Sequence, residues 1–278
     1  MEKEQLNMAY AAGALDGDGS FYICRREDKS YVKYVPGAGV GKSCKELIDF
    51  FMESFSGNVS QRGDHYVWSI SCATRMIPFL ERVLPRLKTK KEQAKCLLQW
   101  MKDGMPSKEE AYLQMKSINS HTVKSVEPPN YKIDEDHIKW AYLAGLMDTD
   151  GSFMIHKRIG HNGMKSPNYL AKVSYGEVDA RPHNFIRSVF PFGSMNLKDS
   201  SVVEGGRYVW ELVVKEEIIE FINRLLPYMR VKKPNAEIVL DFCKNYKATK
   251  KGHRFGVPPE ELAFREKCYQ DLQKLQRR

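Results

Sequence analysis

The chain has 278 residues, of which 42% are hydrophobic, so it is long enough to bury a substantial core in one or two domains. It carries 44 basic against 35 acidic side chains, and this net charge of +9 favours a polyanionic partner such as nucleic acid. The six cysteines form no C-x-x-C pair, which argues against a zinc site and a disulfide framework and indicates a reducing compartment. Because no signal-like segment and no run of 18 apolar residues occurs, we expect neither secretion nor a membrane partner.

Apolar periodicity and turn residues predict the elements in chain order. The first helix ends at Asp16 and Asp18. After it we expect strands over 21–26 and 31–35, a helix over 45–55, strands near 59 and over 66–71, and helices over 76–84, 91–101 and 107–118. The segment 119–132 has turn formers and a double proline without an apolar period, which indicates a linker. Beyond it, Asp134 or Asp136 is the predicted N-cap of another helix.

The chain contains two diverged copies of one sequence. The stretch AYAAGALDGDGSFYI at 9–23 returns as AYLAGLMDTDGSFMI at 141–155, so Asp18 corresponds to Asp150. Two further matches pair YVW at 66–68 with 208–210 and LPRLKTKK at 84–91 with LPYMRVKK at 226–233. We therefore predict an α+β fold of two pseudo-symmetric αββαββα repeats, with domains at 1–118 and 133–278 joined by the linker 119–132.

The repeated helices, called the motif helices below, carry small residues four positions apart. Gly13 and Gly145 lie on these stripes, and such stripes let two helix backbones approach closely. Ordinary core packing is the simplest interpretation of both glycines. The natural partner of each motif helix is therefore the other motif helix.

Packing does not explain the aspartates at the helix ends. If the motif helices lie side by side, Asp18 and Asp150 are neighbours, and their like charges and the negative helix ends oppose ionisation. Such a pair is costly without a cation, and Mg²⁺ takes oxygen ligands and completes its shell with substrate phosphate. The alternative is that all the aspartates are helix-ending turn residues. Because D-x-D-G-S-F occurs in both copies, we favour a metal-dependent phosphodiester site, with Asp16 and Asp148 as its structural members.

The segments AAGALDGDG at 11–19 and LAGLMDTDG at 143–151 resemble the LAGLIDADG motif of homing endonucleases. The resemblance covers both repeats and the linker, and it points to the monomeric two-motif members of that family. It implies that the motif helices form the interface between the two halves and that each half has a curved antiparallel sheet that binds DNA. The first copy departs from the motif at Ala11 and Ala14, where leucine is usual, which affects packing more than chemistry.

The resemblance also implies the site residues. It places the metal-binding residues at Asp18, Asp150, Gly17 and Thr149. The implied catalytic residues are Asp18, Asp150, Lys90, Lys232 and Glu177. A lysine in such a place stabilises charge on the phosphate or orients water, although a solvated helix start is the alternative for each lysine.

Glu177 fits the position at the end of the second strand where family members often carry Gln or Glu. In the corresponding region the first half offers only Gly39 and Gly41. Nearby, PGAGVGKS at 36–43 comes close to the P-loop pattern, but Pro36 stands where its first glycine is required. We therefore expect no nucleotide site there.

Alternation after each motif turns Phe21 and Ile23 toward the core, as it does Phe153 and Ile155. The opposite faces then meet either solvent or a DNA groove, where arginine reads guanine and apolar groups touch the thymine methyl. Candidate DNA-binding residues are Tyr22, Cys24, Arg26, Met154, His156 and Arg158, with Lys45 and Arg181 as phosphate contacts. Because the two halves differ at these positions, we expect a long, asymmetric target.

The resemblance implies a site-specific double-strand DNA endonuclease that hydrolyses one phosphodiester per strand and leaves short 3′ overhangs, as in intron homing. Mg²⁺ is the expected cofactor; Mn²⁺ is expected to substitute, and Ca²⁺ to bind without supporting cleavage. We expect a monomer in an organelle, either mitochondrion or chloroplast, or in a bacterial or archaeal cytoplasm. The alternatives are a group I intron RNA maturase, with intron RNA as a partner, and a DNA-binding regulator that does not cut. Retention of both acids and both lysines favours the nuclease.

Overall fold

A computed structural model describes residues 2–28, 30–123, 136–159, 166–198, 206–247 and 256–276. The first half contains α1 (Glu2–Asp18), β1 (Gly19–Glu27), β2 (Val32–Lys42), α2 (Lys45–Phe55), β3 (Asn58–Arg62), β4 (His65–Ile70), α3 (Ala73–Val83), the 3₁₀ helix η1 (Leu84–Arg86), α4 (Lys91–Lys102) and α5 (Lys108–Asn119). The second half contains α6 (Asp136–Asp150), β5 (Gly151–Arg158), β6 (Asn168–Glu177), α7 (Ala180–Val189), β7 (Ser194–Lys198), β8 (Arg207–Leu212), α8 (Lys215–Leu225), α9 (Lys233–Asn245) and α10 (Pro259–Gln276). The repeated αββαββα order is confirmed, and two further α-helices end each half.

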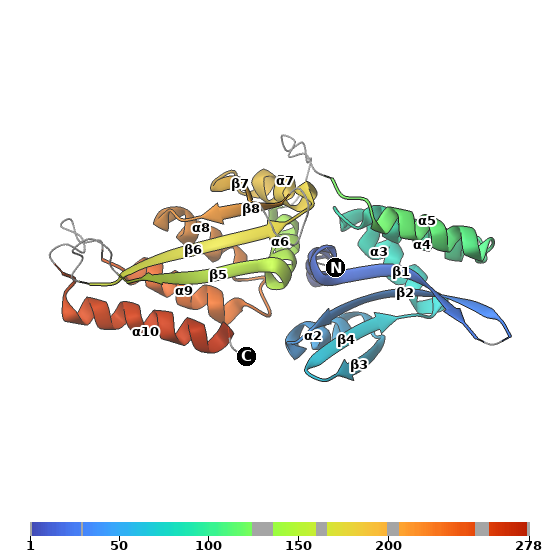
Figure 1. Cartoon of the computed structure of the whole chain (residues 1–278), viewed down its shortest axis with the longest axis horizontal. Coiled ribbons are helices and arrows are strands. Elements are labelled where there is room, and N and C mark those ends of the chain that lie inside the picture. Colours follow the sequence, from blue (N-terminus) through green and yellow to red (C-terminus); the bar gives the residue numbers. More distant parts are fainter. Residues whose placement is uncertain are drawn as a thin grey trace.

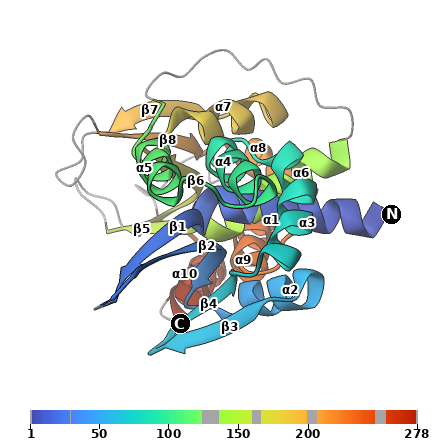
Figure 2. The ribbon, with the colours of Figure 1, turned by 90° about the vertical axis from the view of Figure 1, so that its right-hand side faces the viewer.

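Each half builds a four-stranded antiparallel sheet with the same topology. The strand orders are β1-β2-β4-β3 and β5-β6-β8-β7. The motif helices α1 and α6 lie between the two sheets, and β1 and β5 run outward from them in opposite directions (Figure 1). In the turned view, α7 and β7 lie on one side of the motif helices and α2 and β3 lie on the other (Figure 2). The fold therefore brings the ends of both motif helices to the centre of the molecule.

Each sheet has one face packed against helices and one open face. Phe21 and Ile23 of β1 are buried, as are Phe153 and Ile155 of β5, because alternate residues of a strand point to opposite faces. Tyr22, between the first pair, is 38% exposed. The predicted alternation is confirmed in both halves.

Strand β2 differs from its prediction, because it runs over Val32–Lys42 instead of ending near residue 35. Pro36 lies inside the strand, opposite Ile23 of β1. Proline has no N–H group for a sheet ladder, but β2 pairs with β4 only from Ala38 onward, so Pro36 lies where one side of the strand has no β4 partner. The stretch that comes close to the P-loop pattern is thus mostly part of strand β2.

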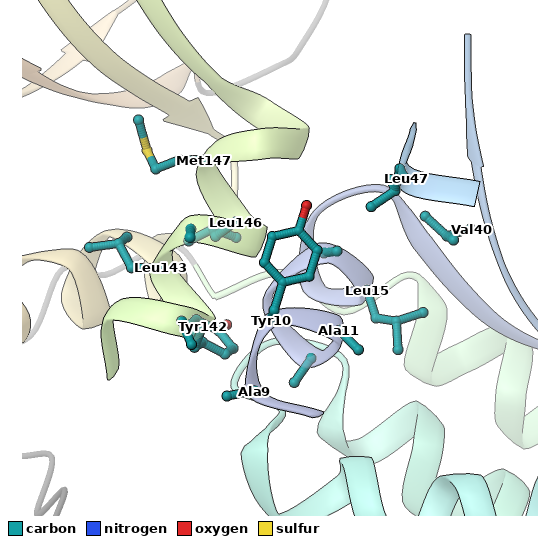
Figure 3. Close-up of a cluster of buried hydrophobic side chains, with 14 of the residues drawn as sticks. Ala9, Tyr10, Ala11, Leu15, Val40, Leu47, Tyr142, Leu143, Leu146 and Met147 are labelled. Atoms are coloured by element: carbon teal, nitrogen blue, oxygen red, sulfur yellow. The ribbon is translucent and has the colours of Figure 1, made fainter. Parts of the chain in front are cut away.

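The motif helices are in direct backbone contact. A β-carbon built on Gly13 would lie 1.9 Å from the carbonyl oxygen of Tyr142, and one on Gly145 would lie 2.0 Å from the carbonyl oxygen of Tyr10. Buried apolar side chains from both helices surround this contact, among them Leu15 and Leu146 (Figure 3). Only glycine permits so close an approach, which explains the small-residue stripes.

Asp136 is the first residue of α6, whereas Asp134 lies outside the described residues, as does most of the predicted linker.

All six cysteines are free thiols, as their spacing predicted. Of the helices in the described ranges, none combines the length and the apolar character that a bilayer crossing requires.

Candidate active site

Asp16 and Asp148 are buried and serve as anchors for the backbone. The Asp16 carboxylate accepts hydrogen bonds from the amides of Lys88 at 2.6 Å and Lys90 at 2.8 Å. Asp148 accepts from the amides of Arg230 and Lys232, both at 2.8 Å. Each aspartate therefore fixes the loop that precedes α4 or α9 against its motif helix.

A pair of tyrosines extends these anchors across the interface. The hydroxyl of Tyr10 donates to Asp148 at 2.8 Å, and the hydroxyl of Tyr142 donates to Asp16 at 2.6 Å. The guanidinium of Arg230 lies over the Tyr10 ring, 5.0 Å from its centre. These contacts join the two halves through buried, charge-assisted hydrogen bonds.

Asp18 and Asp150 are the last residues of α1 and α6, and the packing of these helices brings them together. The pKa of Asp150 is raised to about 6, first by burial and then by the negative charge of Asp18. A carboxylate held in this way gains from a cation, because a cation offsets both the lost hydration and the repulsion. Ionisation of Asp150 beside Asp18 is therefore unfavourable, as the sequence predicted for two neighbouring acids.

Lys90 and Lys232 lie at equivalent places at the starts of α4 and α9. The Lys90 amine donates to the carbonyl of Gly17 at 2.5 Å and to that of Gly19 at 2.7 Å. The Lys232 amine donates to the carbonyls of Thr149 and Gly151, both at 2.6 Å. Burial lowers the pKa of Lys232 to about 8, and burial also lowers the pKa of Lys90.

The oxygen atoms at the two helix ends suit a hard divalent cation. In the described ranges, no three His, Cys, Asp or Glu side chains group as a ready-made metal cage. The oxygen donors are the carboxylates of Asp18 and Asp150 and the carbonyls of Gly17 and Thr149, each of which also accepts a hydrogen bond from a lysine amine. Such a partial set fits Mg²⁺, which binds through one or two carboxylates and takes further oxygens from water and substrate phosphate.

Glu177 is the last residue of β6, pairs with Tyr208 and accepts a hydrogen bond from the amide of Val178 at 2.7 Å. In the first half, Lys42 pairs with Tyr66, the residue that corresponds to Tyr208. Lys42 is therefore the counterpart of Glu177.

This register corrects the expectation that only Gly39 and Gly41 occupy the region that corresponds to Glu177. Those two glycines precede Lys42 in β2, and Lys42 takes the equivalent position. The sequence contained a signal, because GKSC at 41–44 can be aligned without a gap with GEVD at 176–179. Because Lys42 and Glu177 have opposite charges, the sequence comparison did not pair them.

Lys42 also has the contacts of a site residue. Its amine forms an ion pair with Asp18 and donates to the carbonyl oxygen of Thr149 at 2.9 Å. One side chain of the first half thus joins the ends of both motif helices.

The predicted DNA-binding residues follow the open face of each sheet. Arg26, His156 and Arg158 are exposed, Tyr22 is 38% exposed, and Cys24 and Met154 are half-buried. The Tyr22 ring lies over Gly37 of the neighbouring strand, where a β-carbon would come within 2.2 Å of it. The open faces therefore combine cations, an aromatic ring and the half-buried sulfur-containing side chains of Cys24 and Met154.

The two predicted phosphate contacts differ in their surroundings. Lys45 is the exposed first residue of α2, with Asp49 at 3.9 Å. The side chain of Arg181 binds the carboxylate of Asp179, which also caps α7. Lys45 is therefore open to a phosphate, whereas Arg181 would have to share its charge with Asp179.

No family model and no curated protein matches the chain. Solved structures do. I-SmaMI bound to an uncleaved DNA target in the presence of calcium ions matches with a TM-score of 0.73 and 19% identity, over 96% of this chain and 98% of that one. The LAGLIDADG homing endonuclease I-SmaMI bound to cleaved DNA gives 0.72 and 19%, over 96% and 97%. I-GzeII, in complex with its DNA target, gives 0.69 and 15%, over 96% of each chain. The chain therefore has the fold of the two-domain LAGLIDADG homing endonucleases.

Proposed function

We propose that the protein is a monomeric, site-specific DNA endonuclease that depends on a divalent metal ion. The observation that carries the proposal is the meeting of Asp18 and Asp150 at the centre of the fold, each beside a buried lysine amine. The open sheet faces extend on both sides of this centre, and the net charge of +9 suits DNA. The compared proteins with this fold are described as bound to DNA, which supports DNA over intron RNA as the partner.

The residues at the helix ends have distinct roles in this proposal. Asp18 and Asp150, with the carbonyls of Gly17 and Thr149, would hold the ion, for which Mg²⁺ is the first choice. When bound, the ion supplies Lewis-acid stabilisation of the charge that develops on the phosphate. Lys90 and Lys232 hold fixed positive charge next to the same carbonyls, where they favour the anionic phosphate over neutral groups.

The two sheets make the proposed target long and asymmetric. Each open face would follow the major groove for roughly one turn of about 10 base pairs. Arg26 in the first sheet and Arg158 in the second are exposed, whereas the half-buried Cys24 is matched by the exposed His156. Because the two faces present different side chains, the two half-sites should differ in sequence.

A cleavage selection tests the proposal. The protein is incubated with a large randomised DNA library and Mg²⁺, and the cut ends are sequenced. We expect one long asymmetric site cut on both strands by the wild type and by Asp103→Asn, a matched variant of an exposed residue at the end of α4. Asp18→Asn and Asp150→Asn should bind the same site without cutting it.

Two outcomes would contradict the proposal. Specific binding without cutting by the wild type, in Mg²⁺ and in Mn²⁺, would overturn the proposed nuclease activity and favour a DNA-binding regulator. Equal cutting by Asp150→Asn and Asp103→Asn would show that the aspartate pair takes no part in cleavage. Ca²⁺ should support binding by the wild type but no cleavage.

A further inference from the structure

The two ends of the motif helices are not electrically equivalent. We define the first centre as the Asp18 carboxylate, the Thr149 carbonyl and Lys42, and the second centre as the Asp150 carboxylate, the Gly17 carbonyl and Glu177. The definition follows the pseudo-symmetry, because each centre takes its acid and its strand residue from one half and its carbonyl from the other. The strand residues have opposite charges, and this is the main difference between the centres.

In the first centre, the Lys42 amine contacts both oxygen donors. It forms an ion pair with Asp18 and donates to the Thr149 carbonyl at 2.9 Å. The side chain comes from the end of β2, two residues beyond Val40, which pairs with Gly19 at the start of β1. Lys42 is only 21% exposed, so protein surrounds the ammonium group and its charge is weakly screened.

In the second centre, the equivalent strand position carries the carboxylate of Glu177, and the lysine amine there is that of Lys90, which donates to the Gly17 carbonyl at 2.5 Å. Glu177 lies two residues beyond Tyr175, which pairs with Gly151 at the start of β5, so it approaches the helix end as Lys42 does. Its carboxylate accepts a hydrogen bond from the amide of Val178. The Asp150 carboxylate lies close to Gly17, where a β-carbon would come within 2.7 Å of it.

The charges predict different affinities for a divalent cation. Each centre has one further lysine, because the Lys232 amine donates to the Thr149 carbonyl and the Lys90 amine to the Gly17 carbonyl, so these two lysines do not distinguish the centres. The acid and the strand residue together are neutral in the first centre and carry two negative charges in the second. Since attraction between ions grows with the product of their charges, a divalent ion favours the second centre. In the first centre it would have to displace the Lys42 ammonium group from its ion pair with Asp18, whereas Lys42 acts on Asp150 only through space.

We propose that the Lys42 amine occupies the first centre in place of a divalent ion, so that only the second centre binds a divalent ion tightly and the two DNA strands are cut at different rates. Lys42 is then a positioning residue that acts through the ligands Asp18 and Thr149. The unequal cutting of the two DNA strands rests on the proposed function. The unequal metal sites can be tested on the protein without DNA.

Counting bound Mn²⁺ on the free protein by electron paramagnetic resonance tests the metal sites. The wild type should bind one ion tightly, and Lys42→Gln should bind two, because glutamine removes the ammonium and adds an oxygen donor. Lys116→Gln removes an exposed lysine of α5 and should keep the count at one. Glu177→Lys should abolish tight binding, and this variant keeps the test decisive if Lys42→Gln does not fold.

Two tight ions on the wild type, or an unchanged count in folded Lys42→Gln, would overturn the inference even if the protein cuts DNA. Strand-specific labelling of the selected target then tests whether the two DNA strands are cut at different rates. The wild type should cut one strand about tenfold faster or more, so that nicked DNA accumulates, and Lys42→Gln should reduce that ratio. Equal rates in the wild type would contradict unequal centres, whereas no cutting at all would contradict the proposed function and leave the ion count to decide the metal sites.

Discussion

The backbone of Gly13 lies against that of Tyr142, so closely that a β-carbon on the glycine would come within 1.9 Å of the tyrosine carbonyl oxygen. Gly13→Ala should therefore push the motif helices apart and lower the free energy of unfolding by more than about 3 kcal/mol. Urea denaturation measures this change. Gly176→Ala is the control, because its new methyl group would meet its nearest atom at 3.6 Å. Similar losses in both variants would refute the close approach as a requirement of the fold.

The aspartates of each motif should respond to amidation in opposite ways. Asp16 accepts two backbone amides and the Tyr142 hydroxyl, and an Asn there loses the charge and turns an N–H group toward donors. Asp16→Asn should cost about 2 to 4 kcal/mol of stability. Asp150→Asn removes a repelled, buried charge and should stabilise the metal-free protein by about 1 to 2 kcal/mol. Chemical denaturation in a metal chelator compares the two variants, and destabilisation by Asp150→Asn would contradict the repulsion between Asp150 and Asp18.

The stability of the metal-free protein should depend on pH through Asp150. Its pKa is about 6 in the folded protein and 3.8 as a free side chain, so the folded state binds the proton more tightly. The carboxyl's contribution is complete below about pH 4 and is lost as the pH rises through 6, by about 3 kcal/mol. Denaturation across this range, with Asp150→Asn as reference, isolates the effect. A gap between the two proteins that stays constant from pH 4 to 7 would show that the Asp150 pKa is normal.

Repetition made the centre of the molecule predictable. One copy of the aspartate motif is consistent with an ordinary turn, but two copies after two small-residue helices require partners, and the structure packs α1 on α6 with Asp18 beside Asp150. Alternation likewise predicted the open faces of β1 and β5. Both predictions need only patterns that lie within short segments of the chain.

Features that depend on pairing between distant segments were harder to predict. The local pattern ended the second strand before Pro36, because a proline between strand-like residues resembles a turn, and only the late start of the β4 pairing makes it acceptable. Because the predicted strand ended too early, Lys42 was not recognised as a strand residue that pairs with Tyr66. The hydrogen bonds from Tyr10 and Tyr142 cross the interface, so no spacing within one copy indicates them.

Exposed arginines on the two open faces should contribute separately to the reading of DNA. Arg26 and Arg158 come from β1 and β5, on opposite sides of the motif helices. Arg26→Ala should weaken binding by about 1 to 3 kcal/mol and relax base preference in one half-site only, and Arg158→Ala should do the same in the other. Sequencing of DNA selected in Ca²⁺ by each variant measures the preference.

The salt dependence of binding distinguishes base readout from simple charge attraction. Lys45→Ala removes a predicted phosphate contact, so it should weaken binding to all sequences similarly and lower the slope of log affinity against log salt by about 1. An arginine that reads a base should instead change the selected sequence at a defined position. If Arg26→Ala and Lys45→Ala produce the same uniform loss, then the open face of the first sheet contacts the DNA backbone and the bases are read elsewhere.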